Sequence, residues 1–231
     1  MDVPLYDSLD GQIVLVTGAT RGIGKAIADR LVDLDATVYA GARDTDDIAA
    51  TDRHAIELDV TDDGMVAAVD RIEREQGRLD VLINNAGVMD SREPLDEMPT
   101  DVIDHTLDTN LRGAVLMTKY ALPLLLAEAG GRVVTMSSGL GAITESQSGG
   151  TPAYRISKTG VNGLTKYLDG EYAADGLIAN SVCPGYVQTD MTEGSAPRTP
   201  EKGAETPVWL ARFRPDAPSG RFWRDRAEIE W

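Results

Sequence analysis

The sequence predicts an α/β fold in which one parallel sheet is covered by helices on both faces. Short apolar runs alternate with segments whose apolar residues recur every three or four positions, the spacing of an amphipathic helix. A glycine-rich turn directly follows the first apolar run, where a strand would pass into a helix. Strands that alternate with helices form parallel sheets, because each helix carries the chain back to the same end of the sheet. The 231 residues fit one domain, residues 1–231.

Apolar and β-branched runs mark the expected strands. The first covers residues 12–17 (QIVLVT) and ends in the glycine-rich turn. Beyond Pro184 the chain becomes rich in loops, and one edge strand is expected there, over residues 220–224. The other five strands are expected over residues 36–40, 54–58, 79–83, 132–136 and 178–182.

Helical spacing of apolar residues marks the segments between these strands. Residues 23–34 carry Ile23 and Leu31 on one face, and residues 62–76 form an amphipathic helix that Thr61 is placed to cap. The remaining helices are expected over residues 100–127, 153–174 and 201–212.

The composition excludes several kinds of partner. The formal net charge is −16, and phosphate binding needs a basic patch, so nucleic acid is not expected as a partner. Residues 1–10 carry three Asp and no basic residue, unlike a secretory signal, and no apolar run approaches the ~20 residues that span a bilayer. Cys183 is the one cysteine, interpreted as a small buried hydrophobe rather than a reactive thiol, so no intrachain disulfide can form. We therefore expect a cytoplasmic protein without a membrane partner.

The acidity has a particular form. Five of the 22 basic residues are lysine, and Asp outnumbers Glu by 25 to 13. A charged, lysine-poor surface stays hydrated in concentrated salt, where self-repulsion is screened. We take a halophilic source with an acidic surface as a hypothesis, beside the alternative of an acidic protein from ordinary salinity.

A nucleotide-binding turn is expected after the first strand, over residues 17–24 (TGATRGIG). Gly18 permits the tight turn, Gly22 lets the backbone approach a pyrophosphate, and Gly24 allows close packing of helix and strand. The pyrophosphate would then meet free N–H groups at the helix N-terminus. The spacing is G-x-x-x-G-x-G rather than the commoner G-x-G-x-x-G. Taken alone, such a turn could also be structural or could hold S-adenosylmethionine.

The residues after the second strand favour NADPH over NADH. An NAD enzyme usually carries Asp or Glu there, about 20 residues past the glycines, to bind the ribose 2′-hydroxyl. This chain has Ala42 at that place, followed by Arg43, whose guanidinium suits a 2′-phosphate. Arg21 in the glycine turn could reach the same phosphate. Asp44 could serve the ribose instead, although we expect it to cap a helix starting near Thr45.

Four features near the other strands predict a carbonyl-reducing site. Tyr154 and Lys158 form Y-x-x-x-K, which places both side chains on one face of a helix. Ser138 follows the fifth strand, Asn110 lies in the long helix, and residues 84–87 (NNAG) follow the fourth strand. Each feature alone occurs by chance or in ordinary turns and caps. Chance does not account for their order along the chain.

These residue types match the chemistry of carbonyl reduction. Hydride delivery to a carbonyl builds negative charge on oxygen, which a tyrosine can protonate although its unperturbed pKa is near ~10. The ammonium of Lys158 is expected to lower the pKa of Tyr154 toward working pH. The Ser138 hydroxyl can hydrogen-bond the carbonyl oxygen and hold it against the tyrosine.

Taken together, the motifs resemble those of the short-chain dehydrogenase/reductase family over essentially the whole chain. The resemblance includes TGATRGIG, the LDV run at residues 58–60, NNAG, Asn110, the serine, Y-x-x-x-K and residues 183–190 (CPGYVQTD). It implies a single-domain Rossmann fold with a seven-stranded parallel sheet in the order 3-2-1-4-5-6-7 and helices on both faces.

The resemblance also implies catalytic roles. Tyr154 would be the general acid, and Lys158 would bind the nicotinamide ribose and tune Tyr154. Ser138 would orient the carbonyl, and Asn110 would support a water-linked proton relay.

Cofactor contacts are implied in the same way. Asp59 and Val60 would flank the adenine, and Asn85 would contact the adjoining ribose region. Val187 and Thr189 would hold the carboxamide. The full implied set is Gly18, Thr20, Arg21, Gly22, Ile23, Gly24, Arg43, Asp59, Val60, Asn85, Ala86, Gly87, Tyr154, Lys158, Pro184, Gly185, Val187 and Thr189.

Later residues resemble one branch of the family. Residues 202–211 (KGAETPVWLA), with Pro215, Asp216 and residues 220–222 (GRF), resemble the monomeric carbonyl reductases, which use NADPH on ketones, aldehydes and quinones. Vertebrate members of that branch carry a long insertion between the serine and the tyrosine, which covers the helix pair through which other family members associate. This chain lacks the insertion, so a homodimer or homotetramer stays open.

The sequence therefore predicts an NADPH-dependent reductase of a small carbonyl compound. One alternative is an alcohol or sugar dehydrogenase working in the oxidative direction, against which Arg43 argues. Another is a non-enzymatic NADPH-binding redox sensor, whose relatives typically lose the tyrosine or the lysine. No metal is expected, because His54, His105 and Cys183 show no ligand spacing.

Overall fold

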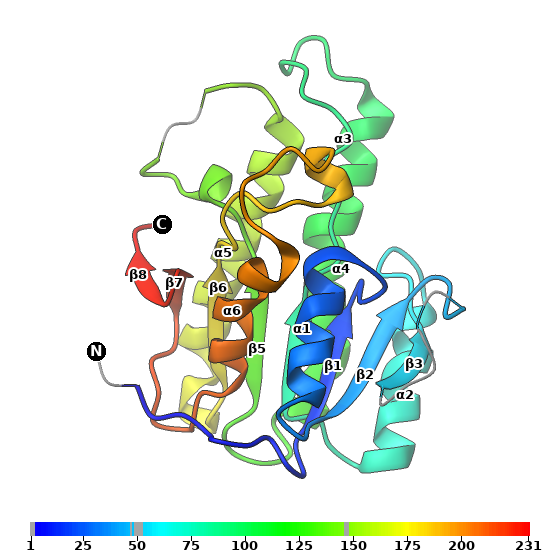
Figure 1. Ribbon diagram of the computed structural model, residues 1–231, viewed down its shortest axis with the longest axis vertical. Helices are drawn as coiled ribbons and strands as arrows, with labels where there is room; N and C mark the ends of the chain where they lie inside the picture. Colours follow the sequence, from blue (N-terminus) through cyan, green and yellow to red (C-terminus); the bar gives the residue numbers. More distant parts are fainter. Residues whose placement is uncertain (1–2, 47, 49–52, 146–147) are drawn as a thin grey trace.

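One sheet runs through the molecule (Figure 1). The computed structural model describes residues 3–46, 48, 53–145 and 148–231, and within them eight strands follow the order β3-β2-β1-β4-β5-β6-β7-β8. Neighbouring strands from β3 to β7 are parallel, and β8 is antiparallel to β7. The bounds are β1 Ile13–Thr17, β2 Thr37–Ala42, β3 Arg53–Glu57, β4 Val81–Asn84, β5 Arg132–Met136, β6 Ile178–Val182, β7 Arg221–Arg224 and β8 Ala227–Ile229.

The order of the first seven strands confirms the expectation, but the expected strand count was wrong. β8 pairs with β7 through a two-residue turn, in which Asp225 and Arg226 have φ of +52° and +60°. Such turns usually signal themselves by Asn-Gly or Asp-Gly, because glycine tolerates positive φ. With arginine in the second place, and only three largely exposed residues in the strand, the sequence carries no hairpin signal.

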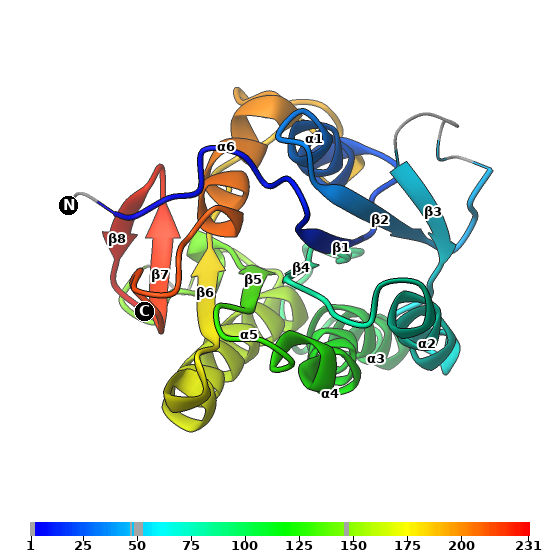
Figure 2. The same cartoon turned by 90° about the horizontal axis from the view of Figure 1, so that it is seen from below.

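Helices cover both faces of the sheet (Figure 2). Because β1 is buried on both sides, its side chains alternate between two clusters: Val14 and Val16 face one, Ile13 and Leu15 the other. The first cluster lies under α1 (Gly22–Val32) and α6 (Pro200–Ala211). The second lies under α2 (Gly64–Gln76), α4 (Gly113–Leu125) and α5 (Pro152–Tyr172). Among the described residues, no helix has the length and apolar character to cross a membrane.

The expected long helix over residues 100–127 is not α-helical throughout, and it ends at Leu125. It consists of α3 (Thr100–Leu107), a π-helical turn (Asp108–Arg112) and α4. The π turn adds a residue without breaking the helical run, so the spacing of apolar residues could not predict it. It ends where Gly113 packs against Val60, whose carbonyl oxygen would lie 2.9 Å from a Cβ at Gly113.

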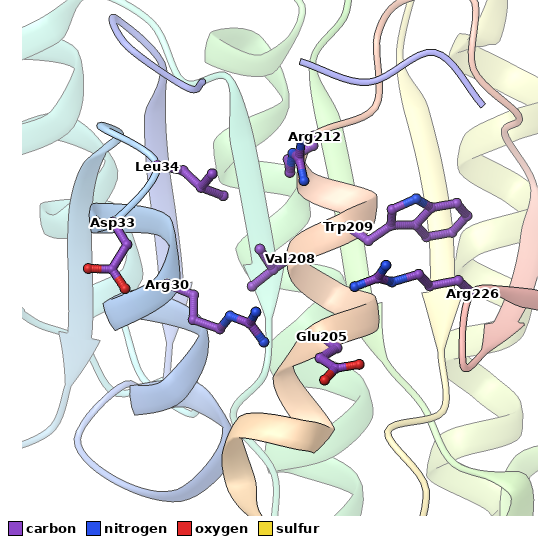
Figure 3. Close-up of a pocket in the computed structure, with 8 residues that line it drawn as sticks. All are labelled: Arg30, Asp33, Leu34, Glu205, Val208, Trp209, Arg212 and Arg226. Atoms are coloured by element: carbon purple, nitrogen blue, oxygen red, sulfur yellow. The ribbon is translucent and has the colours of Figure 1, made fainter. Parts of the chain in front are cut away.

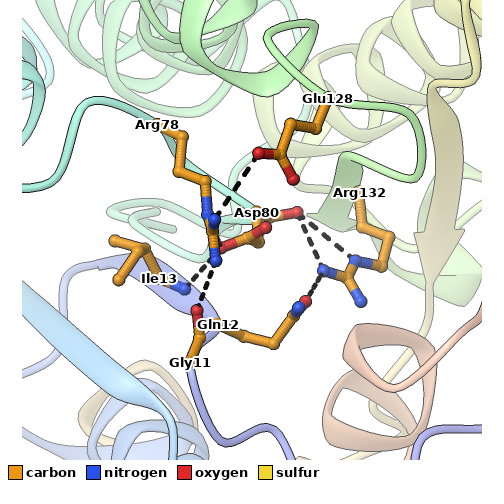
Figure 4. A network of polar contacts seen from close by, with 7 residues as sticks. All are labelled: Gly11, Gln12, Ile13, Arg78, Asp80, Glu128 and Arg132. Atoms are coloured by element: carbon orange, nitrogen blue, oxygen red, sulfur yellow. Dashed lines mark hydrogen bonds and ion pairs between the residues drawn. The ribbon is translucent and has the colours of Figure 1, made fainter.

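The amino ends of the central strands are joined by a buried arginine (Figure 4). Arg132 is only 2% exposed. Its guanidinium donates to the carbonyl oxygens of Asp80 and Phe213 at 3.3 Å and to the Gln12 amide oxygen. The Asp80 carboxylate in turn accepts from the Ile13 N–H at 2.7 Å. Burial lowers the pKa of Arg132 to about 10, so the group stays charged at neutral pH. This network fixes β1, β4 and β5 at the edge opposite the glycine-rich turn.

Candidate active site

The predicted motifs gather at the carboxyl edge of the sheet. β1, β4, β5 and β6 are parallel, so the residues that follow them lie at one edge. The glycine-rich turn follows β1, the NNAG motif begins in β4, Ser138 comes two residues after β5, and residues 183–190 follow β6. Open α/β sheets bind their ligands at this edge.

The glycine-rich turn has the geometry that a nucleotide pyrophosphate needs. Gly18 and Gly22 have φ of +65° and +55°, which disfavour other residues. A Cβ at Gly24 would lie 2.2 Å from the Gly18 carbonyl oxygen, so only glycine fits there. The N-cap residue of α1, Arg21, makes no side-chain capping bond, and the first turn of α1 has no acidic residue. An anionic group is therefore favoured at this helix N-terminus, and the chain fits a dinucleotide here.

Thr17 and Asn85 hold the turn in place. The Asn85 side-chain amide donates to the carbonyl oxygens of Thr17 and Gly18, at 2.9 and 3.0 Å. The Thr17 hydroxyl accepts from the N–H groups of Asn85 and Ala86, both at 3.0 Å. The Asn85 amide is thus committed to the turn itself, and its expected contact with the ribose region stays a prediction. The role of Thr17 could not be predicted, because a threonine that ends a strand carries no signal of its own.

Arg43 stands at the end of β2 as predicted. β2 runs to Ala42, two residues beyond its expected end, so Arg43 directly follows the strand and is exposed. No hydrogen bond or ion pair joins its side chain to another described residue. The Asp44 carboxylate accepts from the Asp46 N–H at 2.9 Å, as a capping residue would. Thr45, Asp46 and Ile48 form turns and bends, so the helix expected from Thr45 is wrong for these residues, and the rest of that stretch lies outside the described residues.

Arg21 has a different partner from the one expected. Its guanidinium pairs with the Asp190 carboxylate at 2.9 Å, and both side chains are 75% exposed. The pair joins the glycine-rich turn to the segment after β6, where Thr189 lies 3.4 Å from a Cβ built on Gly22. An exposed pair of this kind is weak, so Arg21 can exchange Asp190 for another anion.

The residues expected at the adenine and the carboxamide are placed mostly by local bonds. The Asp59 carboxylate accepts from the N–H and hydroxyl of Thr61, at 2.9 and 2.7 Å, so Thr61 caps no helix, contrary to expectation. The side chain of Val187 is buried against α6, 2.9 Å from a Cβ at Gly203, and its carbonyl oxygen accepts from the Thr192 hydroxyl at 2.8 Å, so its contact with a carboxamide stays a prediction. The Thr189 N–H donates to the Thr192 hydroxyl at 3.0 Å.

Asn110 lies inside the π-helical turn and is buried. Its side-chain oxygen accepts from the Val88 N–H at 2.7 Å, and its side-chain nitrogen donates to the Val88 carbonyl at 2.8 Å. The same nitrogen donates to the Ser157 hydroxyl at 3.2 Å. Asn110 thereby fixes the loop after β4, with Gly87 beside it and beside the Lys158 ammonium. This side chain is fully used in positioning, and the expected proton relay stays a prediction.

Tyr154, Lys158 and Ser138 converge. Tyr154 and Lys158 lie on one face of α5, with the Lys158 Nζ 5.5 Å from the centroid of the tyrosine ring. The Ser138 hydroxyl lies close enough to the Tyr154 hydroxyl to oppose the rise in its pKa. The Ser138 hydroxyl accepts from the Leu140 N–H at 3.1 Å. Lys158 is buried, whereas Tyr154 and Ser138 are half-buried. A phenol, a hydroxyl and an ammonium gathered in this way can bind a carbonyl oxygen and protonate it.

The pKa of Tyr154 is not lowered as expected. Burial raises the pKa of Tyr154 to about 12, against the opposing hydrogen bond from Ser138. Burial also lowers the pKa of Lys158 to about 8. The Lys158 ammonium donates to the Met136 carbonyl at 2.8 Å, so it is aimed at the backbone and not at the phenol oxygen. The expected direction of the tyrosine shift was therefore wrong for the site as it stands.

Arg198 was missed by the sequence analysis. Its guanidinium makes two bonds to the Asp225 carboxylate, at 2.7 and 2.8 Å, and lies against Gly185, whose φ is +81°. It thereby supports residues 184–189 beside the site. The partners are 27 residues apart, and no local pattern could have paired them.

A hollow of about 210 Å³ lies away from the predicted site residues, between α1, α6 and the turn before β8 (Figure 3). Arg30, Arg212 and Arg226 line it together with Glu205 and Trp209. Arg212 donates to the Tyr6 carbonyl at 2.8 Å, and Arg30 to the Glu201 carbonyl at 3.4 Å, so these two cations take part in packing. The hollow contains none of the predicted site residues.

Among the described residues, no three His, Cys, Asp or Glu side chains lie together as a metal site requires.

Known proteins share this arrangement. The family model described as short chain dehydrogenase matches residues 12–199. Oxidoreductase UcpA of Escherichia coli K12 is 37% identical over 209 residues, which are 84% of this chain and 77% of that protein. The cis-4-hydroxycyclohexanecarboxylate dehydrogenase of Sinomonas cyclohexanicum is 38% identical over 192 residues, 79% of this chain and 76% of that protein. A short chain dehydrogenase from Burkholderia cenocepacia, solved in complex with NADP, superposes with a TM-score of 0.82 at 29% identity, covering 93% of this chain and 96% of that one.

Proposed function

The chain belongs to the short-chain dehydrogenase/reductase family, and from this premise we propose that it reduces a carbonyl group of a small molecule with NADPH. One observation carries the proposal. Tyr154, Ser138 and the buried Lys158 meet at the carboxyl edge of the sheet, beside a glycine-rich turn that fits a dinucleotide.

Different residues of the chain bind different parts of the cofactor. The turn from Gly18 to Gly24 receives the pyrophosphate, and Arg43 with Arg21 receives the 2′-phosphate. Asp59 and Val60 flank the adenine, and residues 184–189 meet the nicotinamide. When bound, the cofactor supplies a hydride to the carbonyl carbon. A related enzyme from Burkholderia cenocepacia binds NADP, which supports the choice of cofactor.

Ser138 and Tyr154 act on the carbonyl oxygen. The Ser138 hydroxyl donates a hydrogen bond to that oxygen and holds it beside the phenol. As negative charge grows on the oxygen, the Tyr154 hydroxyl transfers its proton to it, leaving a phenolate. A pKa raised to about 12 keeps Tyr154 protonated at neutral pH, which is the state that reduction requires.

Lys158 stabilises the phenolate that this transfer leaves. Its ammonium lies over the tyrosine ring and has a pKa lowered to about 8, so it is charged at neutral pH. Asn110 holds the loop after β4 next to Lys158 and keeps that side of the site fixed. The phenolate then takes up a proton from water before the next turnover.

The oxidative direction is the second candidate. The relative from Sinomonas cyclohexanicum is named a dehydrogenase, so related sites act on alcohols. Oxidation needs a phenolate at the start, and a Tyr154 pKa of about 12 opposes that state. Arg43 argues the same way, because cellular NADPH is kept for reductions. The third candidate, a redox sensor, is disfavoured because both Tyr154 and Lys158 are present.

A short-chain enzyme of this composition suits a cytoplasm rich in salt. The net charge of −16 and the scarcity of lysine support a halophilic source. Activity and fold are expected to be retained in molar KCl and lost at low salt, and a protein indifferent to salt would contradict this part of the proposal. Homodimer and homotetramer both remain compatible with the sequence.

The main test follows NADPH oxidation at 340 nm against ketones, aldehydes and quinones in molar KCl. Tyr154→Phe serves as the inactive variant, and Tyr172→Phe on the same helix as its matched control. Turnover that is lost only in Tyr154→Phe supports the reductase. Tight NADPH binding without turnover of any carbonyl would favour the sensor, and faster turnover of alcohols with NADP⁺ would favour the dehydrogenase.

A further inference from the structure

Residues 138–145, here called the serine segment, are held from two sides. On one side they rest on α5, where the Gly141 carbonyl accepts from the Thr159 hydroxyl at 3.0 Å and from the Asn162 amide at 3.2 Å. A Cβ at Gly141 would lie 2.6 Å from the Lys158 Cβ, so the segment touches the helix that carries the catalytic pair. On the other side lie β7, β8 and Trp231.

Arg224, at the end of β7, makes the central contact on that second side. Its Nη2 pairs with the Glu145 carboxylate at 2.8 Å, and its Nε donates to the Cys183 sulfur at 3.4 Å. The Gly139 N–H donates to the same sulfur at 3.2 Å. Arg224 and Gly139 therefore share one acceptor, and Gly139 directly follows Ser138.

The backbone at Gly139 lies directly on the ion pair. A Cβ there would be 2.6 Å from the Arg224 Nη2 and 2.7 Å from a Glu145 carboxylate oxygen. Arg224 and Glu145 thus pack directly against Gly139, the residue that follows Ser138. Their side chains are 30% and 43% exposed, so neither is needed to fill the core.

Trp231 completes the same side. Its carbonyl oxygen accepts from the N–H and the hydroxyl of Thr144, both at 3.0 Å. Its ring stacks on Phe222 with the centroids 5.5 Å apart, and Phe222 is fully buried with Ala142 and Cys183. Both ends of the serine segment are therefore tied to residues 222–231.

We propose that Arg224 is a positioning residue that sets the Ser138 hydroxyl opposite Tyr154 by holding Gly139, Cys183 and Glu145 in one arrangement. The inference rests on the proposed function, in which Ser138 orients the carbonyl. Catalytic hydroxyls must be held within about 0.5 Å of their working geometry, and groups in direct contact with the backbone supply that precision. The sequence could not suggest it, because Arg224 is 41 residues from Cys183.

The test compares Arg224→Met with Arg221→Met. Arg221 lies on the same strand and also forms an ion pair, with Glu228 at 2.9 Å, but it does not touch the serine segment. We expect kcat for carbonyl reduction to fall about 10- to 100-fold in Arg224→Met and to stay near wild type in Arg221→Met, because misplacing a catalytic group costs rate. NADPH affinity, measured by fluorescence, should be unchanged in both. Equal kcat values in the two variants would overturn the proposal.

A double variant separates positioning from general damage to the fold. If Arg224 acts through the Ser138 hydroxyl, Arg224→Met should cost little further kcat once Ser138→Ala is present. If Arg224→Met lowers kcat as much in the Ser138→Ala background as in the wild type, Arg224 does not act through the Ser138 hydroxyl. Arg224→Lys keeps the charge and the pair with Glu145, and it should recover part of the lost kcat.

Hydrogen exchange provides a readout that needs no turnover. The amides of Gly139 and Thr144 should exchange at least tenfold faster in Arg224→Met than in Arg221→Met, while the amides of β5 keep their protection. Unchanged exchange over residues 138–145 would overturn the proposal. Failure of the proposed function is recognised separately, because wild-type protein would then fail to oxidise NADPH with any carbonyl, or would do so equally well as Ser138→Ala.

Discussion

The Lys158 ammonium lies 5.5 Å from the centroid of the Tyr154 ring, yet it donates to the Met136 carbonyl and not to the phenol oxygen. Lys158 is buried and Tyr154 is half-buried, and desolvation moves their pKa values in opposite directions: that of Tyr154 up to about 12 and that of Lys158 down to about 8. The proton donor of the proposed reaction is therefore stable over the whole neutral range, and the lysine is the group that titrates.

This relationship predicts the pH dependence of reduction. Lys158 is charged below its pKa of about 8 and loses its proton as the pH rises through that value, whereas Tyr154 stays protonated until about 12. The value of kcat/KM for the carbonyl, which reports the free enzyme, should be constant in mild acid and fall above pH 8 with a single ionisation. Lys158→Met should be much less active at every pH and lack this ionisation. A wild-type profile that stays flat to about pH 10 would contradict the assignment.

Cofactor choice should depend on Arg43. A hydrogen bond between charged groups is worth about 1.5–3 kcal/mol, so Arg43→Ala should raise the KM for NADPH about 10- to 100-fold. The KM for NADH should change little, because NADH has no 2′-phosphate. Lys25→Ala removes another exposed cation, one close to the glycine-rich turn and paired with Asp29, and should affect neither cofactor. Steady-state kinetics with both cofactors decide the matter, and an equal change for NADH and NADPH would disprove the role of Arg43.

Asp190 should oppose NADPH binding. Its carboxylate occupies Arg21 at 2.9 Å in an exposed pair, and such pairs contribute at most about 1 kcal/mol. Asp190→Asn frees Arg21 for the 2′-phosphate and should lower the KM for NADPH about two- to fivefold at the lowest KCl concentration in which the wild-type protein stays folded and active. The gain should disappear in molar KCl, where exposed charges are screened. Glu228→Gln, which also removes the acidic partner of an exposed arginine, Arg221, serves as the control. A higher KM for NADPH in Asp190→Asn would mean that the pair supports the turn instead.

Residues that directly follow a strand could be located from the sequence. Gly18, Arg43 and Ser138 each come after a buried apolar run, and parallel strands bring such residues to one edge. The conformations of side chains at that edge could not be predicted in the same way. Lys158 is aimed at Met136, 22 residues away, and this contact decides that its charge does not lower the pKa of Tyr154.

Two further features depend on contacts that no local pattern records. The π-helical turn that carries Asn110 lies within an unbroken helical run, and it is fixed by the bonds from Asn110 to the distant Val88. The support of the serine segment joins Gly139 to Cys183 across 44 residues and Cys183 to Arg224 across 41. Packing between distant parts of the chain decides such features, whereas periodicity and turn chemistry decide the strands and helices.

Stability should depend on Arg132, far from the site. Arg132→Leu leaves the Phe213 carbonyl oxygen and the Gln12 amide oxygen without their buried donor, whereas the Asp80 carbonyl keeps the backbone N–H of residue 132, at 2.9 Å. An unsatisfied buried acceptor costs about 1–3 kcal/mol, partly relieved where water can enter, so we expect a loss of about 3 kcal/mol in the free energy of unfolding.

Arg214→Leu is the matched control, because Arg214 is exposed and lies over the same Tyr6 ring as Arg132, at 5.5 and 5.4 Å. Urea unfolding should show a lower midpoint with an unchanged slope in Arg132→Leu and almost no change in Arg214→Leu. The KM for NADPH should be the same in both variants, because the network joins β1, β4 and β5 at the edge opposite the cofactor. Equal midpoints for the two variants would mean that the buried bonds of Arg132 contribute no more than an exposed cation over Tyr6.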